Sequence, residues 1–311
     1  MRTLVVGAGA IGGYFGGRLL EHGRDVTFLV REGRAAVLAR NGLQIRSATG
    51  DVTLPAPPTV LASDLHAQYD LVLLSCKAYS LEQVMADIAP AVGPQTTILP
   101  LLNGMRHLDL LDARFGADRV LGGQCVIAAT LDAQGVVLHL NQSHSLTFGE
   151  RDGTSSERMH RITQSLEDAG FESRPSDTIL QDMWDKWVFL ASLAGITCLM
   201  RAPIGDIVAA PGGAAVTLRL LEECRAVAER SGHAPSAATL QRARGVLTET
   251  GSSLTASMMR DLQHGHAIEA DQVIGDMLSR AAEPQGGHSL LAVVYAHLKA
   301  YEAGRARATS A

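Results

Sequence analysis

The feature that most constrains this chain is the run Gly7-Ala8-Gly9-Ala10-Ile11-Gly12, which fits the pattern G-x-G-x-x-G. Residues 3–6 before it are apolar and β-branched and predict a buried strand, and residues 10–21 predict a helix. A glycine-rich turn that joins a strand to a helix is typical of a dinucleotide site. The alternative is a glycine-rich turn that packs closely and binds nothing.

Each glycine of this turn has an expected role. Gly7 permits the tight turn, Gly9 lets a pyrophosphate approach the backbone, and Gly12 lets the helix and the strand pack closely. The backbone amides at the start of the helix, beginning with Ala10 and Ile11, would hold the phosphates with help from the helix dipole. We therefore predict a nucleotide-binding turn at these residues.

The second predicted strand, residues 25–30, indicates which nucleotide is bound. In an NAD site an acidic residue closes this strand and binds the ribose 2′-hydroxyl. Here Arg31 closes the strand, with Arg34 nearby, and a guanidinium attracts a 2′-phosphate, so we predict NADP(H). Glu32 leaves alternatives open, because it could neutralise Arg31 or bind a ribose hydroxyl itself. Arg31 could also be an ordinary surface cation.

Composition narrows the class of protein. A length of 311 residues predicts two domains or one large domain with a substantial core. Apolar residues make up 46% and charged residues 19%, which is typical of a globular chain. The formal net charge of −5, without a long basic run, argues against a nucleic-acid partner.

Four cysteines, Cys76, Cys125, Cys198 and Cys224, lie far apart without metal-ligand spacing. They predict no metal site and suit a reducing cytosol, so we expect a cytoplasmic protein. The first strand begins directly after Met1-Arg2, so we expect no signal peptide.

We also expect no membrane partner. The most apolar stretch, which follows Lys186, is interrupted by polar and glycine residues and ended by Arg201.

The first half of the chain alternates strand and helix signals, which predicts an α/β fold with a parallel sheet covered on both faces. Further strands are predicted at residues 70–75, 97–101, from 120 and near 171, a helix at 81–89, a hairpin over 43–54, and an added hairpin formed by 136–138 and 146–148.

From residue 177 onward the pattern is helical, with segments at 216–228, 237–247, 269–282 and 290–301. We therefore predict a nucleotide-binding domain over residues 1–176 and an all-helical domain over residues 177–311. The apolar surface of the helical half would suffice for a homodimer, and a packed core within one chain is the alternative.

Two polar segments follow predicted parallel strands, where ligands of such sheets bind. Lys77 follows the strand at residues 70–75 and is suited to a cofactor phosphate. Asn103 follows the strand at residues 97–101 and is suited to the nicotinamide ribose or a substrate carbonyl. The alternatives are a solvated lysine and a turn-forming Asn-Gly pair.

Lys186 is the candidate proton donor. The residues after it, Trp187 to Ala191, are apolar around every face of a helix, and a lysine there is costly unless it is paired or reaches a wet cleft. Glu269 lies at the margin of an apolar stripe and could set the charge of Lys186 or accept a substrate hydroxyl, and Ser257 lies in the segment before it. The alternatives are a snorkelling lysine paired with an aspartate, an exposed first-turn glutamate and a solvated serine.

These segments together resemble the ketopantoate reductase (2-dehydropantoate 2-reductase) family over nearly the whole chain. The resemblance is carried by the glycine turn, Arg31, Cys76-Lys77-Ala78, Asn103-Gly104-Met105, Trp184-Asp185-Lys186, and Ser257-Met258-Met259 with Glu269 beyond. It implies a Rossmann-type doubly wound parallel sheet followed by an all-helical domain resembling that of 6-phosphogluconate dehydrogenase. It also implies NADPH-dependent reduction of 2-dehydropantoate to pantoate, in pantothenate biosynthesis.

The resemblance implies a role for each site residue. Arg31 and Lys77 would bind the 2′-phosphate, and Asn103 would hold the nicotinamide end and the substrate. Lys186 would protonate the ketone oxygen, and Glu269 would accept a substrate hydroxyl. Ser257 would bind the substrate carboxylate.

At four positions where the family pattern has asparagine, this chain has an apolar residue. They are Leu190, Ala194, Ile204 and Leu254. Losing these polar groups leaves the hydride chemistry intact but removes hydrogen bonds that would select a hydroxylated substrate. The alternatives are therefore an enzyme of the same architecture acting on a more apolar 2-keto acid or hydroxy acid, or a non-catalytic NADP(H) sensor.

Overall fold

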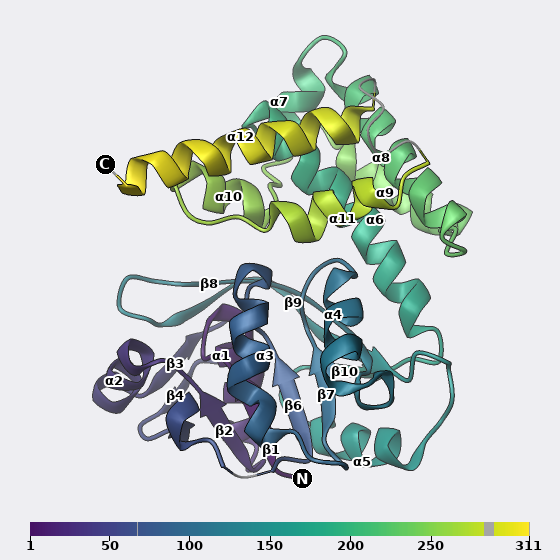
Figure 1. The fold of residues 1–311 in the computed structure, drawn as a ribbon. Helices are drawn as coiled ribbons and strands as arrows, with labels where there is room; N and C mark the ends of the chain where they lie inside the picture. Colours follow the sequence, from purple (N-terminus) through teal and green to yellow (C-terminus); the bar gives the residue numbers. More distant parts are fainter. Residues whose placement is uncertain (67, 283–288, 311) are drawn as a thin grey trace. The chain divides into compact units, whose positions relative to one another are not determined.

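The computed structural model describes residues 1–66, 68–282 and 289–310, and its contacts divide them into two compact units (Figure 1). Unit 1 comprises Met1–Leu102 and His107–Ile179. Unit 2 comprises Asn103–Arg106 and the described residues from Leu180 onward. The short turn at Asn103 therefore groups with the helical half, although its neighbours on both sides in the sequence belong to unit 1.

Unit 1 is built on a five-stranded parallel sheet with the order β5-β2-β1-β6-β7. Its strands are β1 (Thr3–Val6), β2 (Val26–Leu29), β5 (Thr59–Val60), β6 (Leu71–Leu74) and β7 (Thr97–Pro100). β1, β6 and β7 are buried along their whole length, as expected for strands covered on both faces. The predicted α/β fold with a doubly wound parallel sheet is confirmed.

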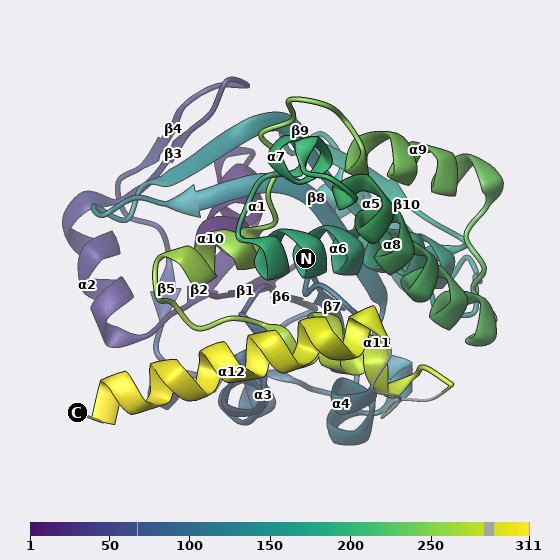
Figure 2. The same ribbon diagram turned by 90° about the horizontal axis from the view of Figure 1, so that it is seen from above.

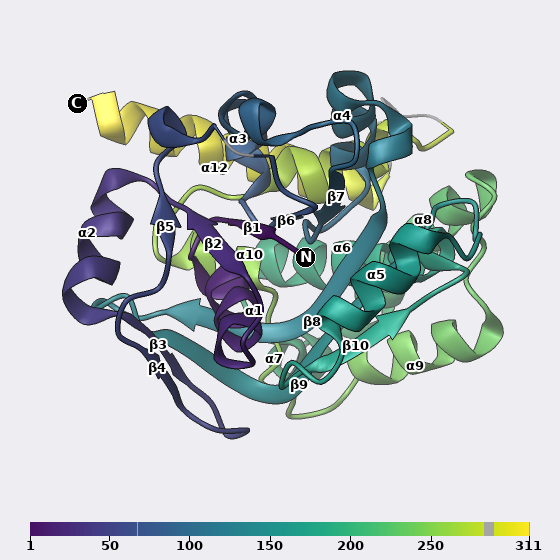
Figure 3. The same cartoon turned by 90° about the horizontal axis from the view of Figure 1, so that it is seen from below.

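Helices cover both faces of this sheet, with α3 and α4 on one face and α1 on the other (Figures 2 and 3). The helices of unit 1 are α1 (Ala10–Glu21), α2 (Glu32–Asn41), α3 (Leu81–Ile88), α4 (Arg106–Phe115) and α5 (Glu157–Leu166). Short 3₁₀ turns lie at Ala62–Asp64, Ala78–Ser80, Ala89–Ala91 and Ala117–Arg119.

A second sheet lies on the far side of α1 and has the order β10-β9-β3-β4, with β8 paired to β9. Its strands are β3 (Leu43–Arg46), β4 (Val52–Leu54), β8 (Gly122–Leu131), β9 (Val137–Gly149) and β10 (Glu172–Pro175). The predicted hairpin over residues 43–54 is confirmed as the antiparallel pair β3-β4.

The other predicted hairpin is wrong. Residues 136–138 and 146–148 were expected to be two strands, but residues 137–138 and 146–148 belong to the single strand β9, which pairs with β8. The exposed polar residues between the two runs suggest a turn in the sequence, yet they continue the strand on its solvent side.

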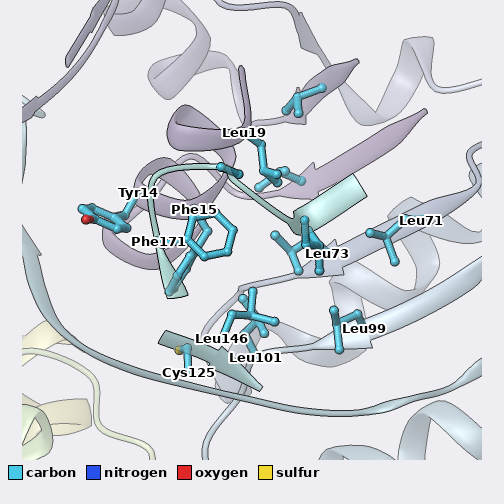
Figure 4. Packing of buried hydrophobic residues seen from close by; sticks show 14 of the residues in the cluster. Tyr14, Phe15, Leu19, Leu71, Leu73, Leu99, Leu101, Cys125, Leu146 and Phe171 are labelled. Carbon is cyan, nitrogen blue, oxygen red and sulfur yellow. The ribbon is translucent and has the colours of Figure 1, made fainter. Parts of the chain in front are cut away.

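Helix α1 contacts both sheets because its paired glycines carry no side chains. A methyl group on Gly16 would come within 2.6 Å of the Phe28 ring, and one on Gly17 within 2.8 Å of Ile45 Cδ1. The larger residues of the helix fill the core between the sheets, with Phe15 edge-on to Phe171 (Figure 4). The glycine-rich sequence thus explains how one helix fits between two sheets.

Unit 2 is helical in all of its regular elements over the described residues. They are α6 (Ile179–Met200), α7 (Ile204–Ala209), α8 (Gly213–Arg230), α9 (Ala237–Leu247), α10 (Ser257–Gln263), the π-helical turn η5 (Asp271–Gly275), α11 (Asp276–Ser279) and α12 (Leu290–Ser310). Helix α8 contacts α7, α9, α11 and α12. Helix α12 extends beyond the predicted end at residue 301, and residue 311 lies outside the described residues.

Of the described residues, one helix, α6, is long and apolar enough to cross a membrane by length and composition alone. The polar residues that were expected to interrupt this apolar stretch do not break the helix. The hydroxyls of Ser192 and Thr197 donate to the Val188 and Leu193 carbonyls of the same helix at 2.7 Å. In the most apolar 18-residue segment of this helix, 67% is buried inside the protein, as in the core helix of a folded domain.

Candidate functional site

The glycine turn of unit 1 has the geometry that its spacing predicts. Gly7 has a φ of +91°, which favours glycine. A methyl group on Gly12 would overlap the Gly7 carbonyl oxygen and Ser75 Oγ, so the helix packs too closely against the residues that follow β1 and β6 for any side chain to fit there. A methyl group on Gly9 would meet nothing within 4 Å, so the space above this residue is open to a ligand.

The start of α1 supplies donors to that open space. The helix begins after Gly9 without a side-chain cap and has no acidic residue in its first turn. The amides of Ala10, Ile11 and Gly12 have no acceptor within the helix, because the first turn of any helix leaves such groups unpaired. The turn therefore suits the phosphates of a dinucleotide.

The other cofactor candidates follow neighbouring strands of the same sheet. Arg31 caps the start of α2 after β2, and Lys77 precedes the 3₁₀ turn after β6, and both are exposed. Because β2, β1 and β6 are adjacent and parallel, their carboxyl ends lie along one edge. The structure thus places Arg31, Lys77 and the glycine turn along that edge of unit 1.

Arg34 has a role that the sequence does not reveal. Its Nε donates to the Ala8 carbonyl at 2.8 Å and its Nη1 donates to the Gly135 carbonyl at 2.9 Å. Burial lowers the pKa of this guanidinium from its ordinary value. Two of its donors therefore hold the glycine turn to the β8–β9 connection, which distinguishes Arg34 from the exposed Arg31.

Lys186 lies in the second turn of α6, where it is half-buried. The next residue, Trp187, is 1% exposed, and its Nε1 donates to the Val273 carbonyl at 2.9 Å. The neighbouring Asp185 carboxylate accepts hydrogen bonds from Gln181 at 2.8 Å and Thr239 at 3.3 Å. The α6 backbone at Lys186 is therefore held by contacts on both sides.

The backbone carbonyls of Asn103 and Glu269 both accept hydrogen bonds from the π-helical turn η5 of unit 2. Gln272 Nε2 donates to the Asn103 carbonyl at 2.7 Å, although the two residues are 169 positions apart. Glu269 accepts from the Val273 amide at 3.0 Å through its carbonyl, and it is half-buried. The π-helical turn η5 thus brings together the segments that carry Lys186, Asn103 and Glu269.

Ser257 is the first residue of α10 and is exposed. Its assignment to the substrate carboxylate stays a prediction.

The four apolar departures also lie in unit 2. Ala194 and Ile204 are buried, whereas Leu190 and Leu254 are half-buried. The Ile204 amide donates to the Leu254 carbonyl at 3.0 Å, so two of these side chains come from adjoining backbone. Among the described residues, no group of three His, Cys, Asp or Glu side chains could hold a metal ion.

Comparison with known proteins identifies the family. The model of ketopantoate reductase PanE/ApbA matches residues 3–153, and the model of its C-terminal region matches residues 178–302. The chain belongs to the ketopantoate reductase family. It is an oxidoreductase, and the predicted resemblance and the expectation of an enzyme are confirmed.

A relative and a solved structure support the assignment, and a second solved structure shares the fold. The uncharacterized oxidoreductase YkpB of Bacillus subtilis is 38% identical over 303 residues, covering 97% of this chain and 99% of that protein. The crystal structure of 2-dehydropantoate 2-reductase from Geobacter metallireducens is 27% identical, covers 96% of this chain and 99% of its own, and has a TM-score of 0.86. A D-mandelate dehydrogenase with NADH and anilino(oxo)acetate, 20% identical and covering 98% of this chain and 99% of its own, shares the fold with a TM-score of 0.86.

Proposed function

We propose that this ketopantoate reductase family member reduces a 2-keto acid with NADPH, with 2-dehydropantoate as the default substrate and pantoate as the product. The observation that carries the proposal is the convergence on η5 of the segments bearing Lys186, Asn103 and Glu269. These are the residues that the reaction needs beyond a bound cofactor: a proton donor, a polar group for the substrate and a carboxylate.

The cofactor assignment is supported by unit 1. The open space at Gly9 and the first-turn amides of α1 suit a pyrophosphate, and exposed Arg31 and Lys77 suit a 2′-phosphate. Residues 1–176 would then form the cofactor domain, and residues 177–311 the substrate domain.

The proposed mechanism assigns one task to each residue of unit 2. NADPH, when bound, supplies the hydride for the carbonyl carbon. Lys186 holds a proton at Nζ and donates it to the ketone oxygen, which becomes the product hydroxyl. Asn103 orients the substrate and the nicotinamide end, Glu269 accepts a hydrogen bond from a substrate hydroxyl, and Ser257 binds the carboxylate.

A more apolar 2-keto acid is the second candidate substrate. It is favoured by Leu190 and Leu254, which stand half-buried where family asparagines are expected. The D-mandelate dehydrogenase of the same fold acts on an aromatic acid, so the architecture accommodates such substrates. We also propose action in the cytoplasm on a free small molecule, since the wide spacing of Cys76, Cys125, Cys198 and Cys224 in the sequence suits a reducing compartment.

A substrate panel tests the proposed function. The protein is mixed with NADPH and a series of 2-keto acids that includes 2-dehydropantoate and aromatic and aliphatic analogues, and loss of reduced nicotinamide is followed by absorbance. We expect turnover of at least one keto acid. Tight NADPH binding without turnover of any of them would support the sensor alternative instead.

A further inference from the structure

The turn η5 is the only π-helical element among residues 1–66, 68–282 and 289–310. π-Helical turns are rare and occur frequently at functional sites. Three consecutive residues of this turn, Asp271, Gln272 and Val273, each hold a different segment of unit 2. The turn is therefore a junction between segments.

Asp271 and Val273 anchor the turn to two long helices. The Asp271 carboxylate accepts from Tyr295 at 2.6 Å and from Lys299 at 3.1 Å, both on α12. Burial alone would raise the pKa of Asp271, but these two hydrogen bonds and the positive charges of Lys299 and Arg106 together outweigh it and hold the pKa below its ordinary value. The Val273 carbonyl accepts from Trp187 beside Lys186 on α6. Both flanks of Gln272 are thus held in place.

Gln272 itself holds the turn that carries Asn103. Its side chain is 4% exposed, and its amide donates to the Asn103 carbonyl at 2.7 Å. The fit around the next residue is tight, because Gly104 has a φ of +76° and a methyl group there would come within 2.6 Å of the Gln272 carbonyl oxygen. The backbone that carries the Asn103 side chain is therefore held by the hydrogen bond from Gln272 and by close packing at Gly104.

We propose that Gln272 is a positioning residue for the reduction, acting through Asn103. The proposal rests on the proposed function, in which Asn103 binds substrate and cofactor. A donor to the Asn103 carbonyl holds the turn in the conformation that presents the Asn103 amide, while the same π turn fixes α6 at Lys186 through Trp187. Small displacements of such a group cost a large part of the rate, since reaction depends on orientation.

The first test removes the donor while keeping the length of the side chain. Gln272→Met should lower kcat/KM for the keto acid by about tenfold to a hundredfold. The matched control is Gln83→Met on the exposed surface of α3, which should leave kcat/KM unchanged. If Gln272→Met fails to fold, Gln272→Asn, whose shorter amide cannot reach the carbonyl, replaces it. A variant within about threefold of wild type would overturn the proposal.

The second test separates positioning from a merely structural role. In Gln272→Glu an ionised carboxylate cannot donate to the Asn103 carbonyl, whereas the protonated acid can. The ratio of kcat/KM between Gln272→Glu and Gln272→Met should therefore rise by roughly tenfold as the pH falls from about 8 to about 5.5. A ratio that stays flat, with the two variants equally lowered in Tm, would show that Gln272 only supports the fold.

Wild-type protein is assayed first. If it reduces no keto acid, the proposed function fails, and hydrogen exchange decides the remaining question. Faster exchange of the Asn103–Met105 amides in Gln272→Met than in wild type would show that Gln272 holds this turn, and unchanged exchange would show that it does not.

Discussion

The glycine turn of unit 1 and the π turn of unit 2 both hold backbone segments so closely that a side chain would not fit between them. At Gly12 the neighbours are Gly7 and Ser75, and at Gly104 the neighbour is Gln272. The first turn leaves an open surface of amides above Gly9, which suits a ligand. The second joins the backbone segments that carry Lys186, Asn103 and Glu269. The proposed function uses this difference: unit 1 would bind the cofactor, and unit 2 would supply the residues that act on the substrate.

The largest expected effect is a loss of kcat, and it tests the role proposed for Lys186 in unit 2. Lys186→Ala should lower kcat by about 10²–10⁴-fold, because the proton donor is lost, while the Kd for NADPH stays near its wild-type value. Steady-state kinetics and fluorescence titration measure the two quantities. Lys186→Arg keeps the charge but is a poor acid, so it should resemble the alanine variant in kcat. Near-full turnover in either variant would remove Lys186 from the mechanism.

The next largest effects test cofactor binding by unit 1 and come from two substitutions in its glycine turn. Gly12→Ala should lower stability by about 1–3 kcal/mol, since the new methyl group meets the Gly7 carbonyl and Ser75. Gly9→Ala should leave Tm unchanged, because the methyl group meets open space, but it should weaken NADPH binding by about tenfold or more by blocking the pyrophosphate. Thermal unfolding and NADPH titration distinguish them. Normal NADPH affinity in Gly9→Ala would contradict a ligand above this residue.

A smaller effect separates the two arginines. Arg31→Ala should weaken NADPH binding by about tenfold to a hundredfold and NADH binding much less, because only NADPH carries the 2′-phosphate. Arg34→Ala is the matched control: it removes the hydrogen bonds to Ala8 and Gly135, so it should weaken both cofactors alike and lower Tm. Equal losses for both cofactors in Arg31→Ala would show that Arg31 does not select the phosphate.

The smallest effect concerns substrate choice in unit 2. Leu190→Asn restores a polar group one turn after Lys186, so the ratio of kcat/KM for 2-dehydropantoate to that for an aliphatic keto acid without a hydroxyl should rise by about threefold to tenfold. Ala194→Asn is a stricter comparison, because Ala194 is 1% exposed and the larger side chain should also lower stability. An unchanged ratio in Leu190→Asn would place the substrate tail elsewhere.

The same comparison explains how much the sequence could predict. The glycine turn and the span of α1, residues 10–21, are confirmed as predicted because their signals are local: a β-branched strand, spaced glycines and a helical run. The grouping of Asn103 with unit 2 could not be predicted, since it depends on Gln272, 169 residues away. Long-range contacts of this kind leave no periodic pattern in the sequence.

Two other features escaped prediction for identifiable reasons. The polar middle of β9 suggested a turn because solvent-facing strand residues and turn residues have similar composition. The hydrogen bonds from Arg34 to Ala8 and Gly135 could not be predicted, because they depend on α2 and the β8–β9 connection both lying beside the glycine turn in the fold. For the candidate site, the sequence led to predictions for the reacting side chains, which stay predictions, but it did not reveal the backbone contacts made by Gln272, Trp187 and Arg34.

The most direct test of the central claim follows the hydride itself. NADPH labelled with deuterium at the transferred position is incubated with the protein and the best keto acid of the panel, and the product is analysed by mass spectrometry. The account predicts a 2-hydroxy acid that carries one deuterium at C2 in wild type, and almost none in Lys186→Ala over the same time. Unlabelled product, or the same labelled yield from Lys186→Ala, would contradict it.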